Sequence, residues 1–158
     1  MKRLPIAILA LACAFTACKK EEDAAPSRDT LLTARNWRLI AHVSSTTTGG
    51  KTTTYDEFAD YDACEKDNFT KFSPNKTLVA DQGAIKCDPD TDQQSNGTWD
   101  FNSDQTKLLL DSPDLGGLII PFELLELNST MMKLRITQTY GTAPNTVVDT
   151  ETYTFNAF

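Results

Sequence analysis

The chain has 158 residues, with 15 Lys and Arg against 22 Asp and Glu and a formal net charge of -7. This length allows one domain with one hydrophobic core, and the 40% hydrophobic fraction is that of a folded protein rather than a disordered one. The acidic balance argues against nucleic-acid binding, which requires clustered Lys and Arg. With one His and no nucleotide-binding motif, we expect neither an enzyme nor a cofactor. The 22 Thr favour strands over helices.

The N-terminus has the layout of an export signal. Lys2 and Arg3 precede an apolar run over residues 4–15. A run of this length cannot cross a bilayer as a helix, which needs about 20 residues, but it suits the apolar region of a secretory signal peptide. We therefore expect residues 1–17 to be removed on export, and the loss of Lys2 and Arg3 takes the net charge from -7 to -9.

Cys18 is the expected site of lipid attachment. Ala17 precedes it, and a lipoprotein signal ends in a small residue followed by the Cys that becomes the acylated N-terminus. Cys13, inside the apolar run, is the competing site, and an ordinary secretory signal with an incidental Cys is the alternative. Residues 18–30 are rich in charge, lack aromatic side chains and include Pro26, which is typical of a flexible linker.

From residue 31 onward the chain reads as a series of short strands separated by turns. The strand-like segments are 36–45, 68–72, 76–82, 97–101, 106–110, 118–127, 130–139 and 147–155. Eight strands in up-and-down order suit an all-β antiparallel barrel, because closure removes both exposed edges of the sheet. An open sandwich is the alternative. The expected barrel domain covers residues 31–158.

Two segments of this domain are expected to lie outside the strands. Residues 46–54 read as a Thr/Gly loop, followed by an acidic stretch to residue 67. Residues 29–36 suit one helical turn, with Asp29 as its cap and Leu31 and Leu32 facing inward.

Several motifs of the domain resemble those of the lipocalin-like lipoproteins of Bacteroidota. Trp37 lies on the first strand, residues 64–72 read Cys-Glu-Lys-Asp-Asn-Phe-Thr-Lys-Phe, and residues 97–101 read Gly-Thr-Trp-Asp-Phe. Arg35 stands where lipocalins carry the Gly of Gly-x-Trp. The resemblance implies a lipocalin-like barrel. Residues 18–23, a Cys followed by Lys and acids, also resemble the surface-export tag of this group, so we expect lipid anchoring at the outer membrane with display at the cell surface.

Cys64 and Cys87 are the two Cys residues of the expected barrel domain. An exported protein reaches an oxidising compartment, where an even pair of Cys favours a disulfide. A metal site is a poor alternative, because no His or further Cys lies close to either residue in the sequence. The sequence therefore predicts a Cys64–Cys87 bridge that closes a long loop.

Metal binding and catalysis both have weak signals. Residues 88–92 begin like a calcium loop, but Gln93 and Trp99 stand where such a loop needs Gly and a bidentate Glu, so we expect an acidic turn and no metal. His42 is expected to point outward, because it alternates with Leu39 and Ala41 on the first strand. No Ser-His-Asp or Cys-His set can be assembled without this His, so we predict no catalytic residues.

The inner face of the strands supplies the candidate core and ligand site. By strand parity we expect burial of Trp37, Leu39, Phe72, Leu78, Trp99, Phe101, Leu108, Leu110, Phe122, Leu124, Met132, Leu134, Tyr153 and Phe155. The candidate ligand-binding residues among them are Trp37, Phe72, Trp99, Phe101, Phe122, Met132, Tyr153 and Phe155.

Two functions fit this pattern. The first is binding of a small apolar ligand in or at the mouth of the barrel, with Tyr55, Phe58 and Tyr61 as a lid. The alternative is a surface-exposed protein- or glycan-interaction module with a solid core, whose Thr/Gly loop and acidic stretch make the contacts. The same residues can line a packed interior or a cavity, so the sequence leaves both functions open.

Overall fold

The computed structural model describes residues 25–111 and 116–158. The predicted signal peptide, Cys18 and the first part of the predicted linker lie outside these residues. The described elements are α1 (Arg28–Thr33), β1 (Asn36–Thr48), β2 (Lys51–Asp56), the 3-10 helix η1 (Glu57–Asp60), α2 (Ala63–Lys66), β3 (Phe69–Phe72), β4 (Thr77–Asp81), β5 (Gln94–Phe101), β6 (Lys107–Asp111), β7 (Ile120–Leu127), β8 (Met131–Tyr140) and β9 (Val147–Ala157). Within the described ranges, no helix is long and apolar enough to span a membrane.

Eight of the strands close into an antiparallel barrel, which confirms the predicted fold class. Their order is β1-β3-β4-β5-β6-β7-β8-β9, and β9 returns to pair with β1. The closing ladder is long, because it runs from Trp37 opposite Ala157 to Thr48 opposite Val147. Except across the β2 insertion, each strand pairs with the next one along the chain, so the barrel is an up-and-down meander.

The predicted Thr/Gly loop is wrong, because residues 46–54 form a β-hairpin. β1 continues to Thr48, turns at Gly49 and Gly50, and returns as β2. Both glycines have positive φ, +56° and +77°, as the tight turn of a two-residue hairpin requires. The many Thr residues favour extended backbone by their branching at Cβ, without needing burial.

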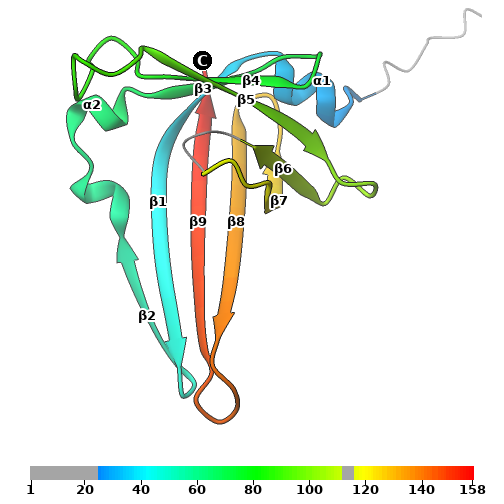
Figure 1. Cartoon of the computed structure of the whole chain (residues 1–158). Helices are drawn as coiled ribbons and strands as arrows, with labels where there is room; N and C mark the ends of the chain where they lie inside the picture. Colours follow the sequence, from blue (N-terminus) through cyan, green and yellow to red (C-terminus); the bar gives the residue numbers. More distant parts are fainter. Residues whose placement is uncertain (1–24, 112–115) are drawn as a thin grey trace, which may run out of the picture.

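Strands β2, β1, β9 and β8 extend beyond the rest of the barrel as a tapering four-stranded sheet (Figure 1). We call residues 43–56 and 136–151 the projecting sheet. Every residue of β2 is exposed, and β2 stands at one end of the strand order. β8 pairs with β7 through its first half, Met132–Arg135, so among the described strands the projecting sheet has two free edges.

The apolar core fills the other end of the barrel. Its buried members are Leu32, Trp37, Phe72, Leu78, Trp99, Phe101, Leu108, Phe122, Met132 and Leu134. Apart from Leu32, which belongs to α1, these are residues that strand parity predicts. Leu110, Leu124, Tyr153 and Phe155, also predicted, are partly buried against this cluster. The alternation of apolar and polar residues along each strand therefore places the core correctly.

Helix α1 covers this end of the barrel. Ser27, rather than the predicted Asp29, caps the helix and accepts a hydrogen bond from the backbone N–H of Thr30. The helix thus begins at Arg28, within the segment that the sequence assigns to the linker. Its Leu32 carbonyl accepts a 2.8 Å hydrogen bond from Nε1 of Trp37, whose side chain is 0% exposed. This bond satisfies the indole N–H inside the core.

The turn between β3 and β4 is held by Lys76. This residue has a φ of +68°, a conformation that usually selects Gly. Its ammonium lies 3.9 Å from the centre of the Trp99 ring and 3.1 Å from Asp100. The cation–π contact and the ion pair offset the cost of the left-handed backbone.

Candidate functional site

A cavity of about 1020 Å³ opens inside the barrel beside the packed core. Strands β1 and β9 supply its apolar side through Trp37, Leu39 and Phe155. Strands β3, β4 and β5 and the segment after β4 supply the opposite side. The interior is therefore packed at one end and hollow at the other.

The hollow follows from small side chains in one cross-strand row. Trp37 stands opposite Thr70, Thr70 opposite Ala80, and Ala80 opposite Ser95. In the next row toward the core, the equivalent positions on β3 and β4 are Phe72 and Leu78. Because Thr, Ala and Ser are much smaller than Phe and Leu, the first row leaves space that the second row fills.

The candidate ligand-binding residues divide between these two ends. Trp37 and Phe155 line the cavity, although Trp37 is also a buried member of the core and Phe155 packs against it. The others lie elsewhere: Phe72, Trp99, Phe101, Phe122 and Met132 belong to the packed core, and Tyr153 is partly buried against it. Edge-to-face contacts join Trp99 to Phe72 at 5.9 Å and to Phe101 at 5.6 Å, so these aromatic rings pack against one another. The structure thus brings two of the predicted residues to the cavity.

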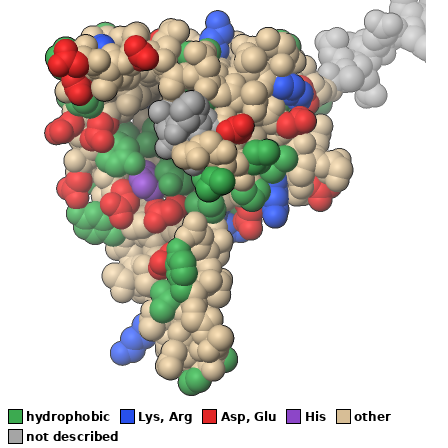
Figure 2. All heavy atoms as spheres, in the orientation of Figure 1, with side chains coloured by type: hydrophobic (Ala, Val, Ile, Leu, Met, Phe, Trp, Pro, Cys, Tyr) green, Lys and Arg blue, Asp and Glu red, His purple; other side chains and the backbone are tan. Residues whose placement is uncertain are grey.

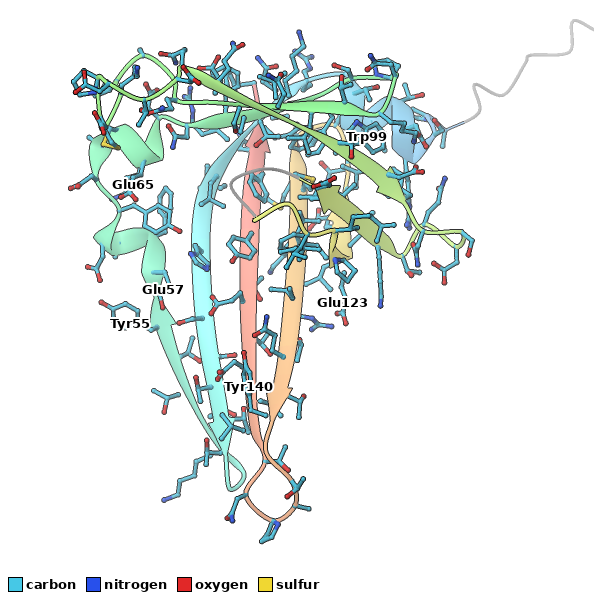
Figure 3. All side chains as sticks on the ribbon, viewed as in Figure 1. Tyr55, Glu57, Glu65, Trp99, Glu123 and Tyr140 are labelled. Atoms are coloured by element: carbon cyan, nitrogen blue, oxygen red, sulfur yellow. A yellow bond between two sulfur atoms is a disulfide. The ribbon has the colours of Figure 1, made fainter. Side chains whose placement is uncertain are left out.

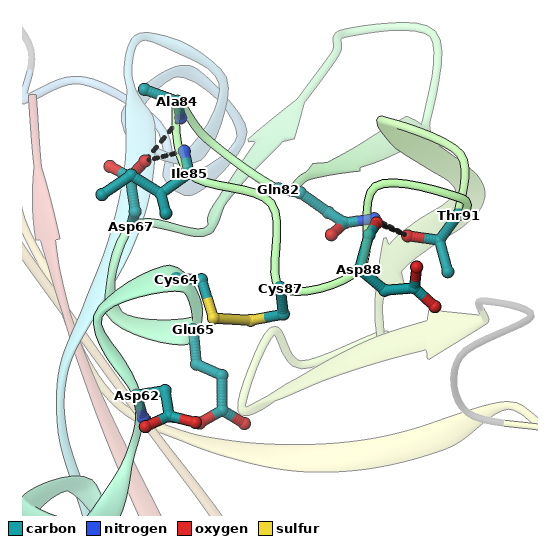
Figure 4. The surroundings of a disulfide bond; sticks show 10 residues. All are labelled: Asp62, Cys64, Glu65, Asp67, Gln82, Ala84, Ile85, Cys87, Asp88 and Thr91. Atoms are coloured by element: carbon teal, nitrogen blue, oxygen red, sulfur yellow. Dashed lines mark hydrogen bonds between the residues drawn. A yellow bond between two sulfur atoms is a disulfide. The ribbon is translucent and has the colours of Figure 1, made fainter.

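The rim of the cavity is made by two segments joined by the predicted disulfide, Cys64–Cys87. Cys64 belongs to the short helix α2, which begins with a capping box between Asp62 and Glu65. Figure 4 shows the bridge between this helix and the segment after β4. The bridge fixes the two sides of the rim relative to each other.

Asp67 and Gln82 hold the second segment in place. Oδ2 of Asp67 accepts hydrogen bonds from the backbone N–H groups of Ala84 and Ile85 (Figure 4). Nε2 of Gln82 donates to Oγ1 of Thr91 at 2.8 Å. Gly83 has a φ of +69°, and a Cβ there would lie 2.5 Å from the Asp67 carbonyl oxygen, so the close approach of the two segments requires Gly at this position.

The lining of the cavity is acidic. Glu65, Asp81, Asp88 and Asp92 contribute to it, whereas no Lys, Arg or His among the described residues does. Side-chain hydrogen bonds from Gln94 and Gln93 hold the pKa of Asp81 below its ordinary value. This carboxylate is therefore charged at neutral pH.

His42 faces the interior, so the prediction that it points outward is wrong. A β-bulge between Leu39 and Ala41 shifts the register of β1 against β9. Ile40 is consequently turned outward and is 44% exposed, and the inward alternation resumes at His42, opposite Tyr153. The run Leu39-Ile40-Ala41 is the signal that could have indicated the bulge, because three successive apolar residues break a strict alternation.

The His42 ring is held on both nitrogens. Nδ1 lies 2.8 Å from the hydroxyl oxygen of Tyr61, and Nε2 lies 2.8 Å from Oε2 of Glu151. The ring also stacks on Tyr153 with 4.3 Å between ring centres. A neutral ring accepts at Nδ1 and donates at Nε2, and a protonated ring donates at both. Either state therefore keeps Tyr61 tied to the barrel wall.

Tyr61 connects this cluster to the cavity, which it lines. Burial, followed by the charges of Glu65 and Glu57, raises the pKa of Tyr61, so its hydroxyl stays protonated. Phe58 packs on it with 5.7 Å between ring centres. Tyr55 is 53% exposed and bonds Asp60 instead (Figure 3). Of the three predicted lid residues, Tyr61 thus lies at the cavity.

Other polar groups near the site bond to their own segments. Oδ1 of Asp88 accepts from the backbone N–H of Asp90, and Oγ1 of Thr91 donates to the Asp88 carbonyl, which makes a compact acidic turn. Oγ of Ser44 donates to Glu57 rather than to His42. In the described part of the chain, no three His, Cys, Asp or Glu side chains gather in a way that could hold a metal ion.

The surface beside the site is also acidic. Figure 2 shows the single His among acidic and hydrophobic side chains, above the narrow and mostly uncharged projecting sheet. No family model and no curated protein sequence matches the chain significantly.

Proposed function

We propose that this protein is a lipid-anchored, lipocalin-like protein of the cell envelope that binds a small apolar ligand in its barrel. The cavity carries this proposal, because a closed barrel with a hollow of about 1020 Å³ and an apolar side has the size of a small-molecule site. Burial of the ligand against Leu39 and Phe155 would drive binding.

The location rests on the N-terminal sequence. The small residue before Cys18 and the charged linker are typical of a lipoprotein, and the resemblance to Bacteroidota lipocalin-like lipoproteins favours the outer membrane and the cell surface. The protein keeps a net charge of -9 after loss of residues 1–17, so its lipid rather than its surface would hold it to an anionic membrane.

The anchor is tested by metabolic labelling with an alkyne fatty acid in the native host. We expect labelling of the wild type and its recovery in the membrane fraction. Cys18→Ser should remove the label and release the protein, whereas Cys13→Ser should change neither. Label retained in Cys18→Ser and lost in Cys13→Ser would contradict the assignment.

The ligand site is tested with the neutral fluorescent probe N-phenyl-1-naphthylamine. Ala80 lies near the end of β4 and faces the cavity, so Ala80→Phe should fill the hollow and abolish probe binding. Val79→Phe adds a similar side chain on the opposite face of the same strand and is the matched control. Equal probe binding by wild type and Ala80→Phe would rule out this cavity as the site.

The projecting sheet favours a second candidate, a protein- or glycan-interaction module. The evidence for this module is that every residue of β2 is exposed and that β2 stands at one end of the strand order. A strand of a partner can pair with such an edge. Capture of a defined protein or glycan that survives Ala80→Phe, but is lost when the hairpin of residues 46–53 is shortened, would favour this module over the ligand-binding barrel.

A further inference from the structure

Among the described residues, the charged ones that line the cavity are all acidic, and an apolar ligand alone does not explain this. Four acidic residues contribute to its lining, Glu65, Asp81, Asp88 and Asp92. Glu65 and Asp88 stand next to the two Cys residues of the disulfide, one on each of the segments that it joins (Figure 4). The acidic groups therefore come from both sides of the rim.

These carboxylates are not neutralised by ion pairs inside the protein. Within residues 25–111 and 116–158, none of the four belongs to a recorded ion pair. Glu65 accepts from the backbone N–H of Asp62, and Asp88 accepts from that of Asp90. Asp81 accepts from Gln93 and Gln94. Hydrogen bonds from neutral donors stabilise a carboxylate but leave its negative charge in place.

Three basic residues of the rim segments and β1 bind backbone oxygens or a carboxylate outside these four. The ammonium of Lys86 donates to the carbonyl oxygens of Pro89 and Thr91. Lys66 donates to the Ala59 carbonyl at 3.3 Å, and Arg38 pairs with Asp67 at 3.5 Å. None of the three lines the cavity. Because a concave site with low-dielectric walls concentrates the field of its charges, the cavity mouth attracts cations and repels anions.

We infer that the ligand is an amphipathic cation, with an apolar body and an ammonium group. The inference rests on the proposed function, since it requires that the cavity take a ligand. The body lies against Leu39 and Phe155, and the ammonium group lies among the rim carboxylates. The ring of Tyr61, which also lines the cavity, offers a face that attracts a cation further. A fatty acid would instead bring its own carboxylate to a site lined by four acidic residues, which would repel it.

Three eight-carbon probes that differ only in head group test this inference: octylammonium, octanol and octanoate. Each displaces the neutral fluorescent probe from the full chain carrying Cys18→Ser, with the disulfide oxidised, at low salt. We expect octylammonium to bind about tenfold more tightly than octanol, and octanoate to bind most weakly. The difference between octylammonium and octanol should shrink as salt is added, because the rim is open to solvent.

Substitutions within one loop separate the rim charges from the overall charge of the protein. Asp88→Asn with Asp92→Asn should bring the affinity for octylammonium close to that for octanol and leave the affinity for octanol unchanged. Asp90 lies between them but does not line the cavity, so Asp90→Asn should preserve the preference for octylammonium. If Asp90→Asn loses as much octylammonium affinity per removed charge as the double variant does, only net charge matters, and the inference is overturned.

The outcomes distinguish the inference from the proposed function. Octanol and octanoate binding as tightly as octylammonium, and blocked by Ala80→Phe, would keep the cavity as a ligand site and overturn the cationic ligand. Failure of all three to displace the probe, together with probe binding that Ala80→Phe does not alter, would overturn both. The expected order of affinities, lost only in the Asp88 and Asp92 double variant, supports both.

Discussion

The barrel and the projecting sheet are built from the same three long strands, but different forces shape them. In the barrel half of β8, Met132 and Leu134 are buried in the core. In the projecting half of the same strand, Gln138 and Tyr140 stand on the same face and are exposed. Ladder hydrogen bonds continue along both halves. The comparison teaches that strand pairing persists where burial ends, provided that the register is already set by a packed region.

The boundary between the two regions lies at the row of His42 and Tyr153. On the barrel side, the next inward-facing residues are Phe155 of β9, which is partly buried, and Met132 of β8, which belongs to the core. On the other side, Glu151 and Asp149 take the same face of β9. His42 stacks on Tyr153 and bonds Glu151, so one ring contacts both an apolar and an acidic layer. The His42 ring thus lies at the end of the barrel interior, where the projecting sheet begins.

The largest difference between the regions should appear in the free energy of unfolding. Trp37→Ala removes a fully buried side chain and its bond to Leu32, and we expect a loss of about 3–5 kcal/mol. Thr47→Ala removes only an exposed hydroxyl contact with Thr52 in the projecting sheet, and we expect a change within about 0.5 kcal/mol. Urea unfolding followed by far-UV circular dichroism measures both. Equal losses would mean that the projecting sheet contributes as much stability as the core.

Opening the disulfide should have the next largest effect. Cys64 and Cys87 are 23 positions apart, and on the chain-entropy model a loop of this size stabilises the folded state by about 3 kcal/mol. Urea unfolding with and without reductant tests this value. The Cys64→Ala and Cys87→Ala double variant should unfold at the same urea concentration in both conditions. A reductant effect that persists in the double variant would show that the bridge is not its cause.

Alkaline pH should weaken the boundary through Tyr153. Burial, followed by the charge of Glu151, raises the pKa of this phenol from 10.0 to about 12. The folded protein favours the protonated form, so the stabilisation is complete below pH 10 and is lost as pH rises toward 12. Because Tyr153 is only partly buried, we expect a loss of about 1–2 kcal/mol. Tyr153→Phe should lose less stability over the same pH range, and an identical loss would assign the effect to other groups.

The barrel could be predicted because its determinants lie along the chain. Alternation of apolar and polar residues on each strand identifies the buried positions, and turn residues separate the strands. The even pair of Cys in a chain that is expected to be exported predicts the Cys64–Cys87 bridge, which the structure contains. These signals depend on local spacing or on a count, so a single sequence is enough to find them.

The hollow and the His42 cluster could not be predicted for a different reason. The hollow depends on Thr70, Ala80 and Ser95 standing in one row, and that row exists only once the register between strands is known. The orientation of His42 depends on one bulge at Ile40, since a shift by one residue turns a side chain to the opposite face. The β2 strand was missed because a polar hairpin has no apolar alternation to detect.

A substitution at the tip of the projecting sheet tests whether the two regions are independent. Gly50 has a φ of +77° at the tip of the projecting sheet, and a Cβ there would meet nothing within 4 Å. Gly50→Ala should therefore cost only the backbone strain of a left-handed Ala, about 1 kcal/mol, measured by urea unfolding. Displacement of the neutral probe should be unchanged, because the turn contributes no residue to the cavity lining. A clear loss of probe affinity would instead show that the projecting sheet and the cavity are coupled through the β1 strand that they share.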